Sequence, residues 1–256
     1  MSDMLLASPE VDTSSFPPHW IVTIEPEVDG ARNMERDVAL ARACAADGRP
    51  RLRLYSWKPW TLSLGHHQPE DSVNHDLLDR NGWGLVRRPT GGRGVFHAQE
   101  ITYAVAMRGE GRGIHEAYAA IVDAIRRGLQ SLGARDLAFS RSSPDFRRHY
   151  ERDESFSCFS VSALNELTWH ERKLVGSAQR RYDDILLQHG SLLLDQAHLS
   201  AVDLLHRDLS EERRRAQRQR LAERTVTLKE ILGGALPSFM TIAEALADAF
   251  QTPATQ

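Results

Sequence analysis

A cysteine and a lysine fifteen positions apart, Cys158 and Lys173, are the residues of this chain best suited to chemistry. The chain has 2 cysteines, and Lys173 is one of three lysines against twenty-nine arginines. A thiol becomes a strong nucleophile when it ionises, and a nearby ammonium lowers its pKa from about 8.5 toward neutrality. A compact ammonium also fits a tight site better than a guanidinium fork does. The pair therefore indicates catalysis by a cysteine thiolate.

Burial is the alternative interpretation of Cys158. Phe156 and Phe159 flank it, and a free cysteine often packs as a small apolar residue. Slow labelling by a thiol reagent at neutral pH, with no pH dependence below about pH 8, would support this interpretation.

A second candidate is the run Arg-Arg-Pro-Thr-Gly-Gly-Arg-Gly-Val-Phe-His at 87–97. Paired glycines let a backbone approach a ligand and expose its N–H groups, and the arginines add positive charge. Such a run suits a phosphate, a carboxylate or a developing oxyanion, although a turn with surface arginines remains the alternative. The candidate binding residues are Arg87, Arg88, Gly91, Gly92, Arg93 and His97.

A third candidate combines Gly-Ser-Ala-Gln at 176–179 with Leu-Gln-His-Gly-Ser at 187–191. Small residues in a strand let another group pack against the backbone. The glutamine and the histidine could supply polar groups to a cleft, although a buried histidine with satisfied hydrogen bonds is the alternative. The candidates are Gly176, Ser177, Ala178, Gln188, His189 and Gly190.

Composition limits the class of protein. The 256 residues are 41% hydrophobic and 26% charged, and the net charge of -3 argues against general nucleic-acid binding. We expect the basic run at 213–220 to be a solvated helix face. No apolar run reaches the roughly 18 residues of a membrane span, and the first residues do not resemble a secretory signal. Cys44 and Cys158 predict neither a disulfide framework nor a metal site, so we expect a cytoplasmic protein.

Hydrophobic periodicity predicts an α+β fold, because strands and helices mix without steady alternation. Residues 136–157 show no period and predict a long irregular segment. We expect a lead-in at 1–30, a catalytic domain at 31–235 and a helical tail at 236–256. Helices are expected at 31–46, 71–81 (capped by Asp71) and 114–132; strands at 52–56, 61–64, 84–88, 95–97, 101–107 and within 164–194; and further helices in the last sixty residues, capped by Thr227 and Thr241.

Six blocks along the chain, in this order, together resemble the biotin/lipoate A/B protein ligase family. They are Asn33–Leu40, Ser63–Gln68, Arg87–His97, Glu100–Tyr103, Lys173–Gln179 and Leu187–Ser191. The resemblance covers about residues 31 to 195. It implies an α+β domain whose mixed β-sheet, packed with helices, cradles a lipoyl-like chain between the arginine-glycine loop and the lysine strand.

Within that family, the cysteine fifteen positions before Lys173 resembles octanoyltransferases of the LipM type. The resemblance implies that Cys158 carries the acyl group as a thioester, that Lys173 activates it, and that the glycine-containing blocks line the acyl pocket. The implied donor is octanoyl-acyl carrier protein, and the acceptor is a lysine on a lipoyl domain of glycine cleavage H protein or of a 2-oxoacid dehydrogenase E2. This role in lipoate biosynthesis and protein lipoylation requires no cofactor and no metal.

Three other functions remain open from the sequence. An ATP-dependent lipoate–protein ligase would form lipoyl-AMP near Lys173. An amidotransferase would move the acyl group between two lipoyl domains and would also use Cys158. A non-catalytic member would bind lipoyl domains only. The loop has Arg93 where lipoyl ligases often have a third glycine, and Ala98 stands where an acidic residue is often found.

Overall fold

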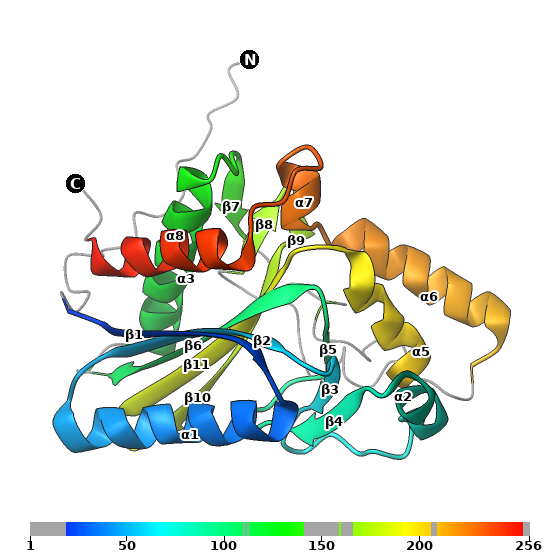
Figure 1. Ribbon diagram of the computed structural model, residues 1–256, viewed down its shortest axis with the longest axis horizontal. Coiled ribbons are helices and arrows are strands. Elements are labelled where there is room, and N and C mark those ends of the chain that lie inside the picture. Colours follow the sequence, from blue (N-terminus) through cyan, green and yellow to red (C-terminus); the bar gives the residue numbers. More distant parts are fainter. Residues whose placement is uncertain are drawn as a thin grey trace.

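A five-stranded mixed sheet forms the centre of the protein (Figure 1). The computed structural model describes residues 19–109, 111, 113–140, 159, 166–205 and 209–252. The strands are β1 (Ile21–Val28), β2 (Arg51–Trp57), β6 (Glu100–Arg108), β10 (Val175–Tyr182) and β11 (Ile185–Leu193). Their order is β1-β2-β6-β11-β10, with β1 and β2 parallel and every other pair antiparallel. The predicted α+β class with a mixed sheet is confirmed.

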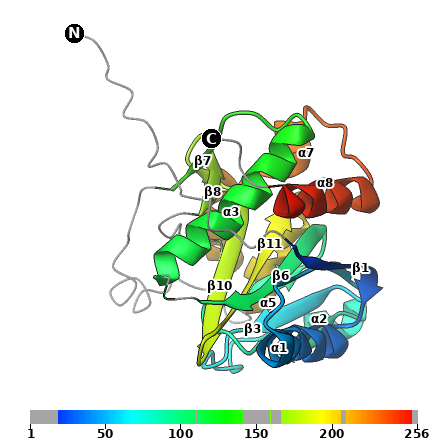
Figure 2. The same cartoon turned by 90° about the vertical axis from the view of Figure 1, so that its left-hand side faces the viewer.

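Helices cover both faces of this sheet (Figures 1 and 2). Helix α1 (Gly30–Asp47) lies on one face, and α3 (Ile114–Ser131) and α8 (Phe239–Gln251) lie together on the other. A Cβ atom on Gly128 would stand 2.9 Å from backbone atoms of both Ala245 and Leu246. The close contact between α3 and α8 therefore requires glycine at this position.

Successive side chains of β6 point to opposite faces of the main sheet. Tyr103, Val105 and Met107 belong to the core that includes α3 and α8, whereas Ala104 and Ala106 belong to clusters with residues of α1. Successive side chains of a strand point to opposite faces, so one strand supplies two cores.

Two three-stranded sheets lie beside the main one. The first contains β3 (Thr61–Leu64), β4 (Gly84–Arg87) and β5 (Val95–His97), and the second contains β7 (Leu137–Phe139), β8 (Leu167–Trp169) and β9 (Arg172–Lys173). The arginine-glycine run forms the connection from β4 to β5. The second sheet brings Lys173 to the start of β10.

Elements from the C-terminal part of the chain hold the backbone of Lys173. The N–H of Val226 donates to the carbonyl oxygen of Lys173 at 3.0 Å, and Thr225 pairs with Lys173 in a parallel bridge. These residues follow α6 (Glu211–Arg224) and precede α7 (Leu228–Ile231). The remaining elements are α2 (His75–Asn81), the 3-10 helix η2 (Gln196–Ser200) and α5 (Ala201–Leu205).

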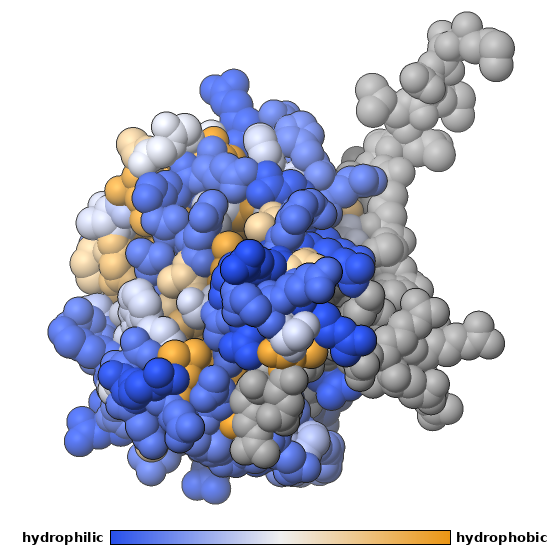
Figure 3. Space-filling model, turned by 90° about the vertical axis from the view of Figure 1, so that its right-hand side faces the viewer, coloured by the Kyte–Doolittle hydropathy of each residue, from blue (hydrophilic) through white to orange (hydrophobic). Residues whose placement is uncertain are grey.

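The basic run lies on α6. Arg213, Arg215 and Arg220 are exposed there, and the face of the molecule on that side is mostly hydrophilic, with small apolar areas between the polar side chains (Figure 3). Among the described helices, none combines the length and the apolar content that crossing a membrane requires.

Most predicted elements are confirmed. The helices expected at 31–46 and 114–132 are α1 and α3, and the strands expected at 52–56, 61–64, 95–97 and 101–107 are β2, β3, β5 and β6. The Thr227 cap is also confirmed, because its hydroxyl accepts a hydrogen bond from the N–H of Glu230.

Two predicted caps are wrong. Asn74, not Asp71, caps α2 and accepts a hydrogen bond from the N–H of Leu77. Ser238, not Thr241, caps α8, which begins one turn earlier than expected. In both cases two cap residues stand three positions apart in the sequence, so spacing alone does not select between them.

Three segments differ from the sequence-based expectation. Strand β1 lies within the expected lead-in. Its residues are partly buried or exposed and none is fully buried, so its sequence lacks the regular apolar–polar alternation of a half-buried strand. Leu137–Phe139 forms β7 at the start of the segment expected to be irregular, while residues 141–157 lie outside the described part. Helix α8, expected in a tail, contributes Leu246 and Phe250 to the main core.

Candidate active site

A pocket lies between the main sheet, the start of α1 and the loop from β4 to β5. Its empty space, open solvent at the mouth included, is about 340 Å³. Seven of the predicted binding residues line it: Arg88, His97, Gly176, Ser177, Ala178, His189 and Gly190. The other lining residues are Met34, Tyr55, Trp57, Val95, Thr102 and Ser191.

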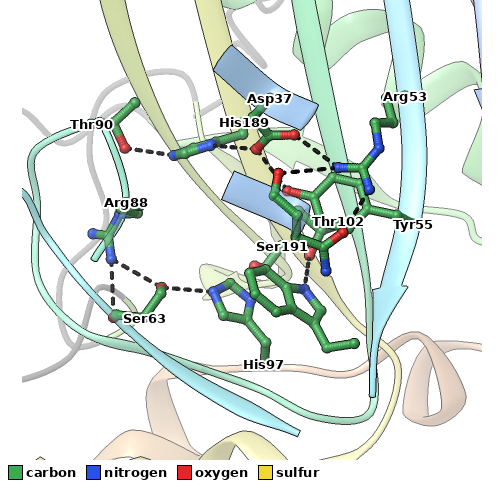
Figure 4. A network of polar contacts seen from close by, with 12 residues as sticks. Asp37, Arg53, Tyr55, Ser63, Arg88, Thr90, His97, Thr102, His189 and Ser191 are labelled. Atoms are coloured by element: carbon green, nitrogen blue, oxygen red, sulfur yellow. Dashed lines mark hydrogen bonds and ion pairs between the residues drawn. The ribbon is translucent and has the colours of Figure 1, made fainter. Parts of the chain in front are cut away.

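Arg88 anchors the glycine turn of the loop from inside (Figure 4). Its guanidinium donates to the carbonyl oxygens of Gly91 at 3.0 Å and Arg93 at 2.6 Å. It also donates to the carbonyl and hydroxyl oxygens of Ser63, both at 3.2 Å, as Figure 4 shows. A buried guanidinium with these acceptors fixes the path of the turn.

Arg87 anchors the neighbouring segment. Its Nη1 donates to the carbonyl oxygens of Gly65 at 2.9 Å and Gln68 at 2.5 Å. A Cβ atom on Gly65 would stand 2.0 Å from the carbonyl oxygen of Gly92. The two glycine backbones therefore lie directly against each other, and Gly92 takes a φ of 94° that favours glycine. Gly91 and Gly92 are exposed.

Asp37, on α1, is the centre of a buried polar cluster that the sequence analysis did not single out. It accepts hydrogen bonds from Arg53 Nη1 at 3.0 Å, Tyr55 OH at 2.8 Å and His189 Nδ1 at 3.2 Å. Burial and the Asp37 carboxylate raise the pKa of Tyr55 well above its ordinary value. Tyr55 therefore stays a hydrogen-bond donor at the pocket wall.

His97 forms part of the opposite wall. Its ring stacks on Trp57, with centroids 4.0 Å apart and planes 13° apart. Its Nδ1 lies 2.7 Å from Oε1 of Glu100, and that oxygen also accepts from Thr102 at 2.5 Å and Ser191 at 3.0 Å. The stacked rings of His97 and Trp57 therefore give this wall a flat surface, and Glu100 fixes the polar groups around it.

Gln188, which the sequence predicted at the cleft, does not line the pocket. Its Nε2 donates to the hydroxyl of Tyr103 at 2.7 Å, and that hydroxyl lies 2.6 Å from Oγ of Ser177. Burial raises the pKa of Tyr103 to about 12. A Cβ atom on Gly190 would stand 2.6 Å from both Ser177 Oγ and a ring carbon of Tyr103. Glycine at 190 therefore makes room for this polar group.

Lys173 is buried and ion-paired. Its Nζ lies 2.7 Å from Oε1 of Glu166, and the two side chains are 1% and 3% exposed. The same Nζ lies 5.3 Å from the ring centroid of Phe159, within range of a cation–π interaction. A Cβ atom on Gly176 would stand 3.3 Å from Cε of Lys173 and 3.0 Å from the Phe159 ring. Lys173 and Phe159 therefore meet directly beside a glycine of the pocket wall.

Cys158, the predicted nucleophile, lies outside the described residues. Its sequence neighbour Phe159 is described and contacts Lys173. The other cysteine, Cys44, is fully buried on α1, and burial raises the pKa of its thiol. Cys44 therefore has the properties of an inert thiol.

The sequence of residues 29–251 matches the lipoyl protein ligase A/B catalytic domain family. The chain belongs to this family. Two relatives of this catalytic domain are named octanoyltransferase LipM. The one from Kyrpidia tusciae is 39% identical over 78% of this chain and 74% of its own length. The one from Exiguobacterium sibiricum is 33% identical over 91% of this chain and 86% of its own length.

The fold of the catalytic domain agrees with that of solved structures. A chain from the structure of a bi-partite lipoate protein ligase and its E2 lipoyl domain from Thermoplasma acidophilum superimposes with a TM-score of 0.70. The match covers 91% of this chain and 83% of that chain at 21% identity. The resemblance to the biotin/lipoate ligase family and to octanoyltransferases of the LipM type is confirmed. Within the described ranges, no group of three or more His, Cys, Asp or Glu could hold a metal ion.

Sequence reasoning did not single out Asp37, Glu100 or Glu166, the buried carboxylates at the pocket and beside Lys173. Asp37 belongs to the first block that carried the family resemblance, so its place in an ordered motif was an available signal. Glu166 stands seven positions before Lys173 across a turn, and no periodicity marks it. Only the pairing of β8 with β9 brings it to the lysine.

Removal of one partner of the Lys173–Glu166 pair should cost stability. We expect Lys173→Ala to lower the free energy of unfolding by about 3–5 kcal/mol, because it leaves a buried carboxylate without its cation. Lys229→Ala is the matched control, since Lys229 Nζ is also 2.7 Å from a carboxylate but its side chain is 45% exposed; we expect a loss of about 0–1 kcal/mol. Urea titration measures both. Equal losses in the two variants would contradict this account.

Acid should weaken the protein through His198, whose Nε2 lies 2.9 Å from Thr225 Oγ1 beside Lys173. Burial lowers the pKa of His198 from 6.5 to about 4. Between these values the unfolded chain binds a proton that the folded protein does not, so the free energy of unfolding falls as pH drops, by about 3 kcal/mol in total.

His198→Gln provides the comparison for this prediction. Glutamine keeps a polar side chain but does not titrate, so the variant should show a flatter dependence of unfolding free energy on pH between 6.5 and 4.5. Urea titrations at several pH values measure the slopes. Parallel curves for the two proteins would rule out His198 as the source.

Proposed function

We propose that this protein transfers an octanoyl group from octanoyl-acyl carrier protein to a lysine of a lipoyl domain, through a thioester on Cys158. The acceptor would be glycine cleavage H protein or the E2 subunit of a 2-oxoacid dehydrogenase. Relatives named octanoyltransferase LipM support the reaction class. The structural observation that carries the proposal is the buried ammonium of Lys173, held against Phe159, the residue next to Cys158.

In the first half-reaction, the thiolate sulfur of Cys158 attacks the carbonyl carbon of the donor thioester. The carbonyl electron pair moves onto oxygen and forms a tetrahedral oxyanion. Collapse restores the carbonyl and expels the donor thiolate, so one thiolate replaces another and no net proton is needed. The acyl-enzyme and the donor are both thioesters of similar energy, and ATP is therefore unnecessary.

Lys173 supplies positive charge to this step. Its side-chain nitrogen lies 2.7 Å from the Glu166 carboxylate, which holds the ammonium in place. A cation held near a thiol favours the thiolate, which is the reactive form. Glu166 keeps the cation in place and balances its charge when Cys158 carries an uncharged acyl group.

In the second half-reaction, the neutral amine of the acceptor lysine attacks the thioester on Cys158. The new C–N bond replaces the C–S bond, the Cys158 thiolate leaves, and the amine nitrogen releases a proton to solvent. The amide product is far more stable than a thioester, so this step drives the cycle forward. Met34, Trp57 and Val95 provide apolar surface for the octanoyl chain in the pocket.

The cysteine must stay reduced for this chemistry. A free thiolate persists in a reducing compartment, so we place the enzyme in the cytoplasm. The positive charge of Lys173 would also suit the acyl phosphate group of an acyl-AMP. The experiment below must therefore distinguish the transferase from a ligase that uses ATP.

Incubation with octanoyl-acyl carrier protein without ATP tests the proposal. We expect the wild type and Cys44→Ala to gain the mass of one octanoyl group, and we expect hydroxylamine to remove it, because thioesters are labile to that reagent. Cys158→Ala should gain no mass while keeping the same unfolding transition. Intact-protein mass spectrometry measures all three proteins.

Two results would replace the proposed transferase. Full lipoylation by Cys158→Ala with ATP and lipoate would establish the ligase. An adduct formed from an octanoylated lipoyl domain, and not from octanoyl-acyl carrier protein, would establish the amidotransferase.

A further inference from the structure

Two buried carboxylates each contact a histidine of the pocket wall, and each histidine contacts a hydroxyl group near the glycine turn. Figure 4 shows Asp37, both histidines and both hydroxyl groups. In the first chain of contacts, Oδ2 of Asp37 lies 3.2 Å from Nδ1 of His189, and Nε2 of that ring lies 2.5 Å from Oγ1 of Thr90. Asp37 and Thr90 are 0% exposed. This series of contacts therefore links α1 to the loop through His189 of β11, and both of its end residues are fully buried.

The second chain of contacts starts at β6. Oε1 of Glu100 lies 2.7 Å from Nδ1 of His97, and Nε2 of that ring lies 2.7 Å from Oγ of Ser63. The same Ser63 oxygen accepts a hydrogen bond from Arg88 at 3.2 Å. This second series of contacts reaches the loop through Arg88, which donates to the carbonyl oxygens of Gly91 and Arg93.

The direction of each hydrogen bond follows from the carboxylates. A carboxylate only accepts, so Nδ1 of His97 and of His189 carries the proton that it donates. When the imidazole is neutral, Nε2 has only a lone pair, and the hydroxyls of Ser63 and Thr90 donate to it. Arg88 agrees with this order, because it occupies the Ser63 oxygen as an acceptor and leaves the hydroxyl hydrogen for His97.

Both ring nitrogens of each histidine are therefore engaged by the protein. His97 and His189, which the sequence predicted as substrate-binding residues, present ring surfaces to the pocket while their nitrogens hold the loop. The Gly91–Gly92 turn has no side chain of its own to fix it and has large backbone freedom. The groups that fix its position include Thr90, directly before it, and Arg88, which donates to the carbonyl oxygen of Gly91.

We propose that Asp37 and Glu100 are positioning residues for the acyl-binding loop: they fix the tautomers of His189 and His97, and these hold Thr90 and, through Ser63, Arg88. The identity of the ligand, the octanoyl donor, rests on the proposed function. The two histidines then shape the pocket, and they take no part in the reaction at Cys158 and Lys173.

Thr90→Val tests the first chain of contacts, because valine keeps the shape of threonine and removes the hydroxyl. We expect amide hydrogen exchange at 90–94 to become about tenfold faster, as after loss of one buried hydrogen bond. Thr90→Ser keeps the hydroxyl and should stay within twofold of wild type. Thr168→Val is the matched control, since Thr168 donates to the carbonyl of Ala138 away from the loop, and it should leave exchange at 90–94 unchanged.

Kinetics separate positioning from general damage. For Thr90→Val we expect the KM for octanoyl-acyl carrier protein to rise about five- to tenfold with kcat within twofold, and the rate of Cys158 alkylation by iodoacetamide to stay unchanged. Loop exchange equal to wild type, or a fall in kcat with unchanged KM, would overturn the proposal. Hydrogen exchange needs no substrate, so it tests the loop independently of the reaction. The absence of an octanoyl adduct is a separate result, and it would overturn the proposed function.

Discussion

A charged lysine in the interior of a protein needs a carboxylate beside it, and this structure supplies Glu166 to Lys173 at 2.7 Å. Desolvation of two charges costs several kcal/mol for each ion, and good geometry and further hydrogen bonds must recover that cost. The surroundings of Lys173 meet the requirement. Strand β8 brings Glu166, the segment after α6 binds the lysine backbone, and Gly176 leaves space for the methylene chain.

The pocket walls also contain buried carboxylates, each bound by several hydrogen-bond donors. On one side, Asp37 is matched by Arg53 and bonded to Tyr55, and on the other, Glu100 collects three donors on one oxygen. Low exposure makes each of these hydrogen bonds strong and makes the loss of any partner costly. The result is a polar frame behind an apolar lining, which suits a ligand with a hydrocarbon chain and a single polar end.

Much of this arrangement could be predicted from the sequence. Lys173 and the glycine blocks were identifiable because their residue types are unusual in this chain and because their order matches a known family. The roles of Arg87 and Arg88 were not predictable, since a guanidinium can bind a ligand anion or a backbone carbonyl equally well, and only the path of the loop decides. Glu166 could not be predicted either. A single glutamate carries no sequence motif, and only the pairing of β8 with β9 brings it to Lys173.

The assignment of the histidines shows a second limit. A histidine beside a glycine suggests a ligand contact, but His189 and His97 are satisfied by groups from α1 and β6, more than a hundred residues away in the first case. Such contacts depend on how the layers pack. The sequence analysis left a buried, satisfied histidine open as the alternative, and the hydrogen bonds of His189 agree with that alternative.

The measurement that tests the account most directly is the pH dependence of Cys158 alkylation by iodoacetamide, in a Cys44→Ala background, with and without Lys173→Met. If the ammonium holds the thiolate, the midpoint of the reaction should lie near neutral pH with Lys173 and should move up by about one unit or more, toward the ordinary cysteine value near 8.5, with methionine. The same midpoint in both proteins would contradict the central claim, because the thiol would then ionise without help from the lysine.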